Sequence, residues 1–418
     1  MTMQPINNAY DVVIVGARCA GAATAMLLAA LGLRVLVFDK GRFGTDTLST
    51  HALMRPAVLL LHRWGLTDRL DDERTPRIEK TAFVYSDDHK NDTIELDIQP
   101  RNGIDMLYAP RRTVLDRIMV EAARHKGADV RHGVQMLDLL RTDSGKVAGV
   151  RLRDESGKVH DVGAGLVIGA DGRRSGVARL VGATPYVWGR HTTTCAFGYF
   201  EDLPVEGNRW YFRPGMGAGA IPTNHSQTCV FASVPDGFAA GSADDRAQAF
   251  HRVIEKSAPD VAARLPAAQL VGKLRFFPGM RGFLRQPWGD GWALVGDAGY
   301  MTDPITAHGI TNALRDADIL ARTIAEGVSL AAYQTARDDL SLKFFEISDR
   351  VASLDWDIAT VQQYHRMMSQ EMGREEEALV SASASASASA SASASASASA
   401  SASASASASA SDSASAPG

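Results

Sequence analysis

Apolar and polar positions alternate along the first forty residues in a way that predicts a strand, a helix and a second strand. Residues Asp11 to Val15 form an apolar run typical of a buried strand. Ala20 to Leu31 has the length and composition of a helix, and Arg34 to Phe38 is a second apolar run that ends on Asp39. Together they predict a βαβ unit with parallel strands.

Two further helices follow. "PAVLLLHRWG" begins with Pro56 and ends with Gly65, which is the preferred order of these residues at helix termini. "RRTVLDRIMVEAARHKG" is amphipathic, with one apolar face formed by Leu115, Ile118, Met119 and Ala122.

The rest of the chain favours a return to the first sheet after an inserted β region. Short strands are expected around Val130, at Val147 to Leu152 and at Leu166 to Ile168. The segment from about Trp188 to Val234 is rich in aromatic residues and glycine turns and predicts further strands. "WALVGDAG" is again an apolar strand, and three helical stretches follow up to about Glu371. The pattern predicts a non-contiguous α/β nucleotide-binding domain.

From Ser381 the chain is a Ser-Ala alternation, broken by Asp412 and the final "APG". Serine at every second position competes for the backbone, and the segment cannot bury enough apolar surface to offset its ordering entropy. We expect a disordered tail; silk-like pairing of strands is the alternative.

Composition and charge narrow the class of protein. The net charge is -4 at pH 7 over 418 residues, which gives no electrostatic reason to expect nucleic acid or an anionic membrane as a partner. Three scattered cysteines do not form a disulfide framework or a zinc site, so no metal is expected and a reducing, cytoplasmic location is favoured. No signal peptide or membrane span is predicted.

The first βα turn, "VGARCAG", is a variant of the glycine-rich phosphate-binding turn. Gly16 lies at the sharp turn and Gly21 where helix and strand approach closely, whereas Arg18 stands at the position of the second glycine. A helix N-terminus after Gly21 would present N–H groups to a pyrophosphate. Asp39 follows at the spacing expected of an acid that binds an adenosine ribose.

Two later segments repeat the order strand, acidic-glycine turn, helix. "GADGRRSGVARLVG" spans Gly169 to Gly182, and "WALVGDAGYMTDPITAHGITNALRDADILA" spans Trp292 to Ala321. In the second segment Gly296 allows a close backbone approach and Asp297 can accept a hydrogen bond from a hydroxyl. A helix starting near Thr306 would direct its N–H groups at a bound anion or electron-rich ring.

In this order, "GARCAG", Asp39, "RRTVLD", "GADGRRS" and "GDAGYMTDP…HGITNA" resemble the motifs of FAD-dependent oxidoreductases of the aromatic-hydroxylase (group A flavoprotein monooxygenase) type, whose relatives include geranylgeranyl reductases and flavin-dependent halogenases. The resemblance spans roughly residues 11 to 330. It implies a Rossmann-like FAD-binding domain (GR2-type) with an inserted β-sheet substrate domain and C-terminal helices. The expected boundaries are 1–75, 105–185 and 285–330 for the FAD-binding domain, 76–104 and 186–284 for the substrate domain, 331–375 for the helices and 376–418 for the tail.

The resemblance also implies roles for individual residues. Gly16, Ala17 and Gly21 would contact the pyrophosphate, Asp39 the ribose, and Arg112 rather than Arg111 would brace FAD. Asp297 would bond the ribityl chain, the turn from Pro304 to Asn312 would lie against the flavin, and Asp171 and Gly172 match an Asp-Gly motif linked to FAD and NAD(P)H. The expected FAD contacts, bound without a covalent link, are Gly16, Ala17, Arg18, Ala20, Gly21, Asp39, Lys40, Ser49, Thr50, Arg112, Asp171, Gly172, Gly296, Asp297, Pro304, Ala307, His308, Gly309 and Ile310. Arg18 departs from the family pattern, and we expect its side chain to lie over or beside the cofactor.

Two groups of residues are candidates for substrate chemistry. The loop "TDTLSTH" reaches the flavin in a subset of the family, which makes His51 a catalytic candidate together with His308; a loop of turn-forming hydroxyls with a solvated histidine is the alternative. Three strands between Arg209 and Phe231 would place Trp210 and Phe212 on one face, and with His225 these are candidates for the substrate pocket. Core packing would explain the same aromatic residues.

Three functions compete. The first is an NAD(P)H-dependent monooxygenase that transfers oxygen to a small apolar or aromatic substrate. The second is a flavin reductase or dehydrogenase of the geranylgeranyl-reductase kind, and the third a non-catalytic flavin-binding scaffold. "GAIP" is only a fragment of the Trp-x-Trp-x-Ile-Pro halogenase signature, which argues against halogenation. The sequence does not fix the oligomeric state.

Overall fold

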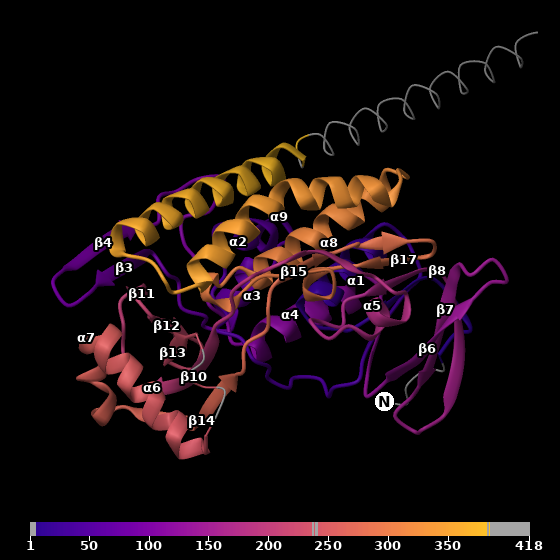
Figure 1. Ribbon diagram of the computed structural model, residues 1–418. Coiled ribbons are helices and arrows are strands. Elements are labelled where there is room, and N and C mark those ends of the chain that lie inside the picture. Colours follow the sequence, from indigo (N-terminus) through magenta and orange to yellow (C-terminus); the bar gives the residue numbers. More distant parts are fainter. Residues whose placement is uncertain (1–5, 236–237, 239–240, 383, 385–418) are drawn as a thin grey trace, which may run out of the picture. The chain divides into compact units, whose positions relative to one another are not determined.

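The computed structural model describes residues 6–235, 238, 241–382 and 384 (Figure 1). It consists of two units, residues 1–371 and 372–418. The three sheets described below belong to the first unit. In the second unit residues 372–382 are helical, so the first part of the predicted tail, 376–382, is a helix; the remainder of that prediction lies almost wholly outside the described residues.

The predicted βαβ unit is present at the N-terminus. It consists of β1 (Ala9–Val15), α1 (Cys19–Ala30) and β2 (Val35–Asp39), with β1 and β2 parallel. Both strands are buried on both faces, as expected for continuous apolar runs in a parallel sheet covered by helices. The helix begins at Cys19, two residues before Gly21, so Gly21 lies inside its first turn instead of preceding it.

This unit is the centre of an eight-stranded sheet among the described residues, in the order β16-β17-β8-β1-β2-β5, with the antiparallel pair β6 and β7 attached to β8. Its other strands are β5 (Asp129–His132), β6 (Gln135–Arg141), β7 (Val147–Arg153), β8 (Val159–Gly169), β16 (Trp288–Gly289) and β17 (Trp292–Leu294). Strand β17 pairs in parallel with β8, which confirms the predicted late return to the first sheet. The sequence did not indicate β6, whose side chains are mostly half-buried or exposed.

Helices cover this sheet. Helix α1 packs against α4 (Arg112–His125) and α8 (Gly309–Ala325), and α8 contacts α2 (Arg55–Arg63) and α9 (Leu330–Ala352) (Figure 1). The predicted apolar face of α4 is buried, from Leu115 to Ala122. The helix predicted to start near Thr306 starts at Gly309, because a short 3-10 turn, η3 (Pro304–Thr306), and the left-handed Ala307 precede it. Further helical segments of the described chain are α3 (Thr67–Asp72), α5 (Gly176–Leu180), η2 (Gly296–Ala298) and residues 358–371.

The inserted β region forms a second sheet of seven described strands, in the order β14-β10-β13-β12-β11-β3-β4. They are β3 (Lys80–Ser86), β4 (Asn91–Asp97), β10 (Thr194–Glu201), β11 (Asn208–Arg213), β12 (Met216–Thr223), β13 (Gln227–Val234) and β14 (Gln269–Phe277). The three strands predicted between Arg209 and Phe231 are β11, β12 and the start of β13. Helix α6 (Ala243–Ser257), α7 (Pro259–Ala262) and η1 (Leu265–Ala267) follow β13, and α6 packs across β10 to β13 with Phe250 and Ile254 in the core.

A small third sheet joins β9 (Pro185–Trp188), β15 (Phe283–Arg285) and β18 (Tyr300–Met301) in the described chain. The structure is thus mixed α/β with a parallel Rossmann-like sheet and an additional sheet, as predicted; the domain boundaries themselves stay a prediction.

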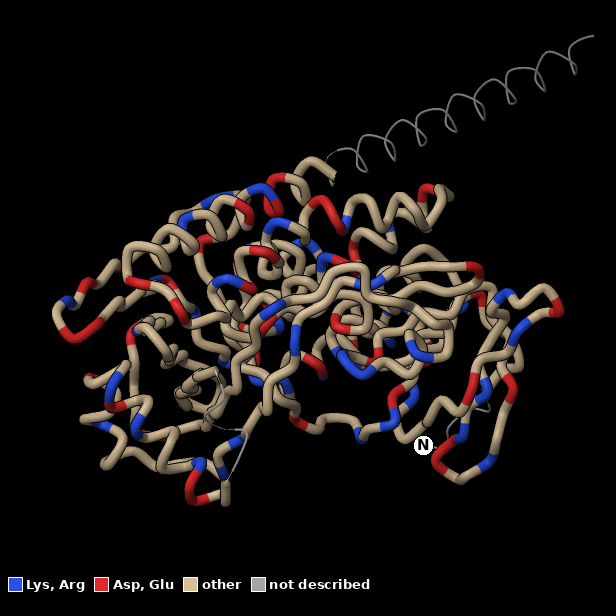
Figure 2. Tube along the Cα trace, viewed as in Figure 1, with Lys and Arg blue, Asp and Glu red and all other residues tan. Residues whose placement is uncertain are grey.

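Basic and acidic residues are interspersed along the described trace (Figure 2). Among the described helices, none combines the length and the apolar character needed to span a membrane.

Candidate active site

A cavity of about 800 Å³ extends from the β1–α1 turn to β10 and β14. It is lined by many of the predicted site residues, which come from segments far apart in the chain. These are Gly16, Arg18, Ala20, Asp39, Lys40, Ser49, Thr50, His51, Arg112, Asp171, Gly172, Asp297, Pro304, Ala307, Gly309 and Ile310. The structure thus brings together motifs that are widely separated in the sequence.

The β1–α1 turn is tight enough to require its glycines. Gly16 has φ +103°, and a Cβ there would lie 2.4 Å from the carbonyl oxygen of Ala170. A Cβ on Gly21 would lie 1.8 Å from the carbonyl oxygen of Gly16, so Gly21 allows the close packing of helix and strand and does not itself line the cavity. Ala20 lines the cavity beside this turn, where the first amides of α1 lack intrahelical partners. The result is a cradle suited to a phosphate.

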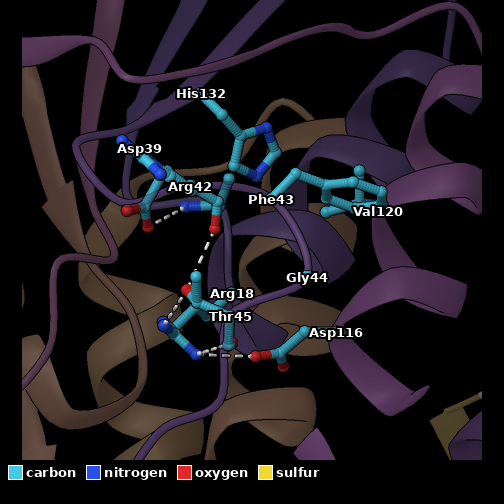
Figure 3. Close-up of a pocket in the computed structure, with 10 residues that line it drawn as sticks. Arg18, Asp39, Arg42, Phe43, Gly44, Thr45, Asp116, Val120 and His132 are labelled. Atoms are coloured by element: carbon cyan, nitrogen blue, oxygen red, sulfur yellow. Dashed lines mark hydrogen bonds and ion pairs between the residues drawn. The ribbon is translucent and has the colours of Figure 1, made fainter. Parts of the chain in front are cut away.

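Asp39 at the end of β2 is held in place by backbone amides. Its carboxylate accepts hydrogen bonds from the amide of Ala17 at 3.1 Å and the amide of Gly41 at 2.7 Å. It lines both the large cavity and a smaller adjoining one, where Ala17 and His132 also lie (Figure 3). The acid is therefore fixed at the edge of the cavity before any ligand binds.

Arg18 is bound to protein groups at the cavity edge. Its guanidinium lies 3.1 Å from the carboxylate of Asp116 and also donates to Thr45 (Figure 3). Asp116 at the same time pairs with Arg112 at 2.9 Å and accepts from the Cys19 thiol at 3.0 Å. The Arg18 side chain is 34% exposed, whereas that of Arg112 is 11% exposed. Arg18 thus lines the cavity, and a carboxylate already neutralises part of its charge.

The Gly-Asp motif lies where α1 and α8 meet. A Cβ on Gly296 would lie 3.0 Å from the Cβ of Ala20 and 3.2 Å from that of Ala313, so glycine is needed for the approach of the two helices, and Gly296 is not part of the cavity wall. Asp297 does line the cavity, and burial raises its pKa to about 6. A half-buried carboxyl group that lines a cavity is suited to bond a ligand hydroxyl.

The turn before α8 directs the start of that helix at the cavity. Ala307 adopts a left-handed conformation with φ 50°, and Pro304, Gly309 and Ile310 line the wall. His308 is 1% exposed, and its ring packs 4.2 Å from the ring of Phe344, outside the residues that line the cavity. The structure therefore does not place His308 in the site, because the turn rotates its side chain towards α9.

The Asp-Gly turn is part of the opposite wall. Asp171 accepts from the amide of Gly176 at 2.6 Å and from the hydroxyl of Ser175, the N-cap residue of α5, and burial raises its pKa. Arg173 and Arg174 follow it and also line the cavity. Both arginines belong to the "GADGRRS" segment, but the sequence did not assign them to the site.

The "TDTLSTH" loop places His51 in the cavity wall. Its backbone is left-handed with φ 54°, its amide donates to the Ser49 hydroxyl at 3.1 Å, and its side chain is buried. The ring stacks on Tyr199 with 5.3 Å between centroids. Neither ring nitrogen has a hydrogen-bond partner within the described part of the chain.

The predicted substrate-pocket residues lie elsewhere. Trp210 packs against Phe231, Phe212 packs against the ring of His365 at 4.2 Å, and His225 is exposed in a turn. The sheet order explains why they do not line this cavity: β10 and β14 border it, and β11 is three strands away from β10. The apolar wall is formed instead by residues that sequence reasoning missed, namely Cys195, Phe197, Phe277, Met301 and Thr302.

The match to known families decides the cofactor. Residues 9–350 match the family defined by an FAD binding domain. The chain belongs to this family. Because the glycine cradle, Asp39 and the cavity-facing Asp297 offer groups for a pyrophosphate and for sugar-like hydroxyls, the residues present fit FAD.

Curated relatives are similar over about three quarters of the chain. A digeranylgeranylglycerophospholipid reductase of Methanothrix thermoacetophila is 28% identical over 76% of this chain and 78% of its own length. A second protein of that name, from Methanococcoides burtonii, is 25% identical over 82% and 79%.

Solved structures show the same fold. The flavin-dependent brominase Bmp2 matches with a TM-score of 0.73 and 20% identity over 88% of this chain and 93% of its own. PqsL of Pseudomonas aeruginosa, a probable FAD-dependent monooxygenase, matches with a TM-score of 0.66 and 20% identity over 88% and 100%. Taken with the family match, the protein is an enzyme, an FAD-dependent oxidoreductase.

Proposed function

We propose that the protein is an NAD(P)H-dependent monooxygenase that acts on a small apolar or aromatic substrate. When bound, FAD supplies the electron transfer and oxygen chemistry that side chains lack. The protein's own part is to bind, orient and exclude water.

We assign these tasks to two ends of the cavity, a dinucleotide end and a substrate end. Gly16, Asp39 and Arg112 would hold the dinucleotide part of FAD without a covalent link, and Asp297 would bond its ribityl hydroxyls. The N-terminus of α8, at Gly309 and Ile310, would stabilise negative charge on the reduced ring. Arg173 and Arg174 are suited to pair with the phosphates of NAD(P)H.

The observation that carries the proposal is the size and lining of the cavity. About 800 Å³ is within the range of ~300–1,000 Å³ typical of a site for one small molecule. FAD would take up much of this volume, so we expect a compact substrate beside it, against Phe197, Phe277 and Met301. An apolar end of this kind keeps water from the reacting atoms, which oxygen transfer requires.

A reductase without oxygen insertion is the second candidate. It is favoured by the names of the curated relatives, which are similar over three quarters of their length. Their lipid substrate would require room for long isoprenoid chains, and the volume of the cavity supports the smaller substrate.

Stopped-flow spectroscopy separates the two candidates without a known substrate. The holoenzyme is reduced anaerobically with NADH or NADPH and then mixed with oxygenated buffer while the flavin spectrum is recorded. The monooxygenase predicts at least two phases and a transient spectrum that belongs to neither reduced nor oxidised flavin. A single-phase return to the oxidised spectrum would contradict oxygen insertion and favour the reductase.

Acid precipitation of the same sample should release FAD into the supernatant; flavin retained in the pellet would contradict non-covalent binding.

A further inference from the structure

His51 is a buried polar side chain that faces the cavity without a partner. It is 1% exposed, it lines the cavity, and both its ring nitrogens lack hydrogen-bond partners within the described chain. Burying a polar group without a partner costs stability, so such groups in native proteins need an explanation. A ligand bound in the cavity would supply the missing partner after a small movement of the wall, because both ring nitrogens are buried.

The ring of His51 is held in position from behind. It stacks on Tyr199, and the guanidinium carbon of Arg111 lies 3.4 Å from the centroid of the same tyrosine ring. Asp46 fixes Arg111 at 2.8 Å and Arg275 at 2.9 Å. The imidazole is thus carried by a rigid set of contacts, although its loop has a strained, left-handed backbone at this residue.

Its surroundings keep the imidazole neutral. Burial, together with the nearby Arg111, Arg112 and Arg275, lowers the pKa of His51 to about 3, although Asp46 opposes the shift. A neutral imidazole offers one N–H donor and one nitrogen acceptor. It can therefore bind a hydroxyl or a carbonyl group of a ligand, and it carries no charge that would attract an anion.

The neighbouring groups restrict the ligand further. Cys195, Phe197, Phe277 and Met301 give this end an apolar wall. Arg111 is already paired with Asp46 and also donates to Gln227 at 2.7 Å, so its charge is committed to the protein.

We propose that His51 anchors the substrate by one hydrogen bond, and that the substrate is an uncharged, mainly apolar ring with a single hydroxyl or carbonyl group. The proposal rests on the proposed function in that the cavity is taken to bind substrate beside FAD. It goes further in naming the group on the substrate and the residue that recognises it.

Binding of simple probes to the oxidised holoenzyme tests the proposal without turnover. Phenol, toluene and benzoate are titrated while the flavin absorbance spectrum is followed. One hydrogen bond corresponds to roughly a 5- to 10-fold change in affinity, so phenol should bind about that much more tightly than toluene. Benzoate should bind more weakly than phenol. Equal affinity for phenol and toluene, or benzoate binding as tightly as phenol, overturns the proposal.

Two variants assign the preference to His51. His51→Phe keeps an aromatic ring on Tyr199 and removes both nitrogens, and it should abolish the preference for phenol over toluene. His51→Asn keeps a donor and an acceptor and tolerates the left-handed backbone, so it should retain part of the preference. FAD content and the circular dichroism spectrum serve as controls for folding.

The other outcomes overturn the proposal. A phenol preference that persists in the folded His51→Phe variant shows that another group binds the hydroxyl. Loss of FAD from that variant with an unchanged circular dichroism spectrum shows that His51 binds the cofactor instead. Because these readouts use oxidised enzyme, they are independent of whether the stopped-flow experiment supports oxygen insertion.

Discussion

The two ends of the cavity differ in whether their polar groups already have partners. At the dinucleotide end Asp39 accepts two backbone hydrogen bonds, and Asp116 joins Arg18 and Arg112. At the substrate end the nitrogens of His51 lack partners in the described chain, and the neighbouring wall is apolar. The first end is preorganised for a cofactor whose shape is constant, whereas the second leaves one polar group to be satisfied by what binds there.

The two ends of the cavity also differ in how far apart in the sequence the residues that form them lie. The dinucleotide end is built around one βαβ unit, in which Gly21 packs against Gly16 in the same turn and Gly16 in addition approaches Ala170. The substrate end joins the "TDTLSTH" loop to β10, β14 and β18, which are separated by more than a hundred residues from that loop. Changes at the two ends should therefore have separable effects on folding, cofactor binding and substrate binding.

The largest effect is expected from Gly16→Ala at the dinucleotide end. A residue other than glycine at this φ costs about 1–3 kcal/mol, and the overlap of its Cβ with the Ala170 carbonyl adds about 1–3 kcal/mol. The free energy of unfolding should fall by about 2–6 kcal/mol, measured by chemical denaturation. Gly32→Ala is the matched control, because Gly32 has φ +83° and a methyl group added there would meet nothing within 4 Å. Equal losses in the two variants would show that the close approach to Ala170 is unimportant.

A pH-dependent effect of intermediate size is expected from Asp297→Asn. Burial raises the pKa of Asp297 from its ordinary value of 3.8 to about 6, so the folded apo-protein favours the protonated acid. The contribution of this group to stability is therefore full below about pH 4 and is lost as pH rises through 6. Asparagine does not ionise, so relative to the parent the variant should gain roughly 2–3 kcal/mol between pH 4 and pH 7.

Thermal unfolding of the FAD-free forms across this pH range measures the difference. Parallel stability profiles for the parent and Asp297→Asn would contradict the burial of an ionisable carboxyl group at this position.

The smallest effect is expected from Arg18. Its side chain is 34% exposed, and ion pairs of this kind contribute about 0.2–1 kcal/mol. Arg18→Leu and Arg18→Gly should each weaken FAD binding by no more than about 5-fold in a flavin titration. Arg112→Leu should have the larger effect, because it removes a buried cation and leaves Asp116 without its closer partner. If Arg18→Leu lowers the affinity for FAD more than Arg112→Leu does, Arg18 pairs with the phosphates of bound FAD and no longer with Asp116.

The sequence predicted the features that depend on neighbouring residues. The βαβ unit, the face of α4 and the return of β17 to the first sheet follow from periodicity and from glycine positions. The positions of Trp210 and Phe212 could not be predicted, because the order of strands in the second sheet is set by long-range pairing such as that of β11 with β3. The packing of His308 could not be predicted for a related reason: the left-handed Ala307 precedes it, its ring packs on Phe344, and no residue pattern indicates that contact.

A pair of titrations on one variant from each end tests the division of the cavity most directly. Asp39→Ala removes a charged acceptor worth about 1.5–3 kcal/mol and should weaken FAD binding ~10- to 100-fold, while at saturating FAD the affinity for phenol stays unchanged. His51→Phe should leave the FAD affinity unchanged and remove the preference for phenol over toluene. If instead Asp39→Ala alters phenol binding at saturating FAD, or His51→Phe weakens FAD binding as much as Asp39→Ala does, the two ends of the cavity do not have separate roles.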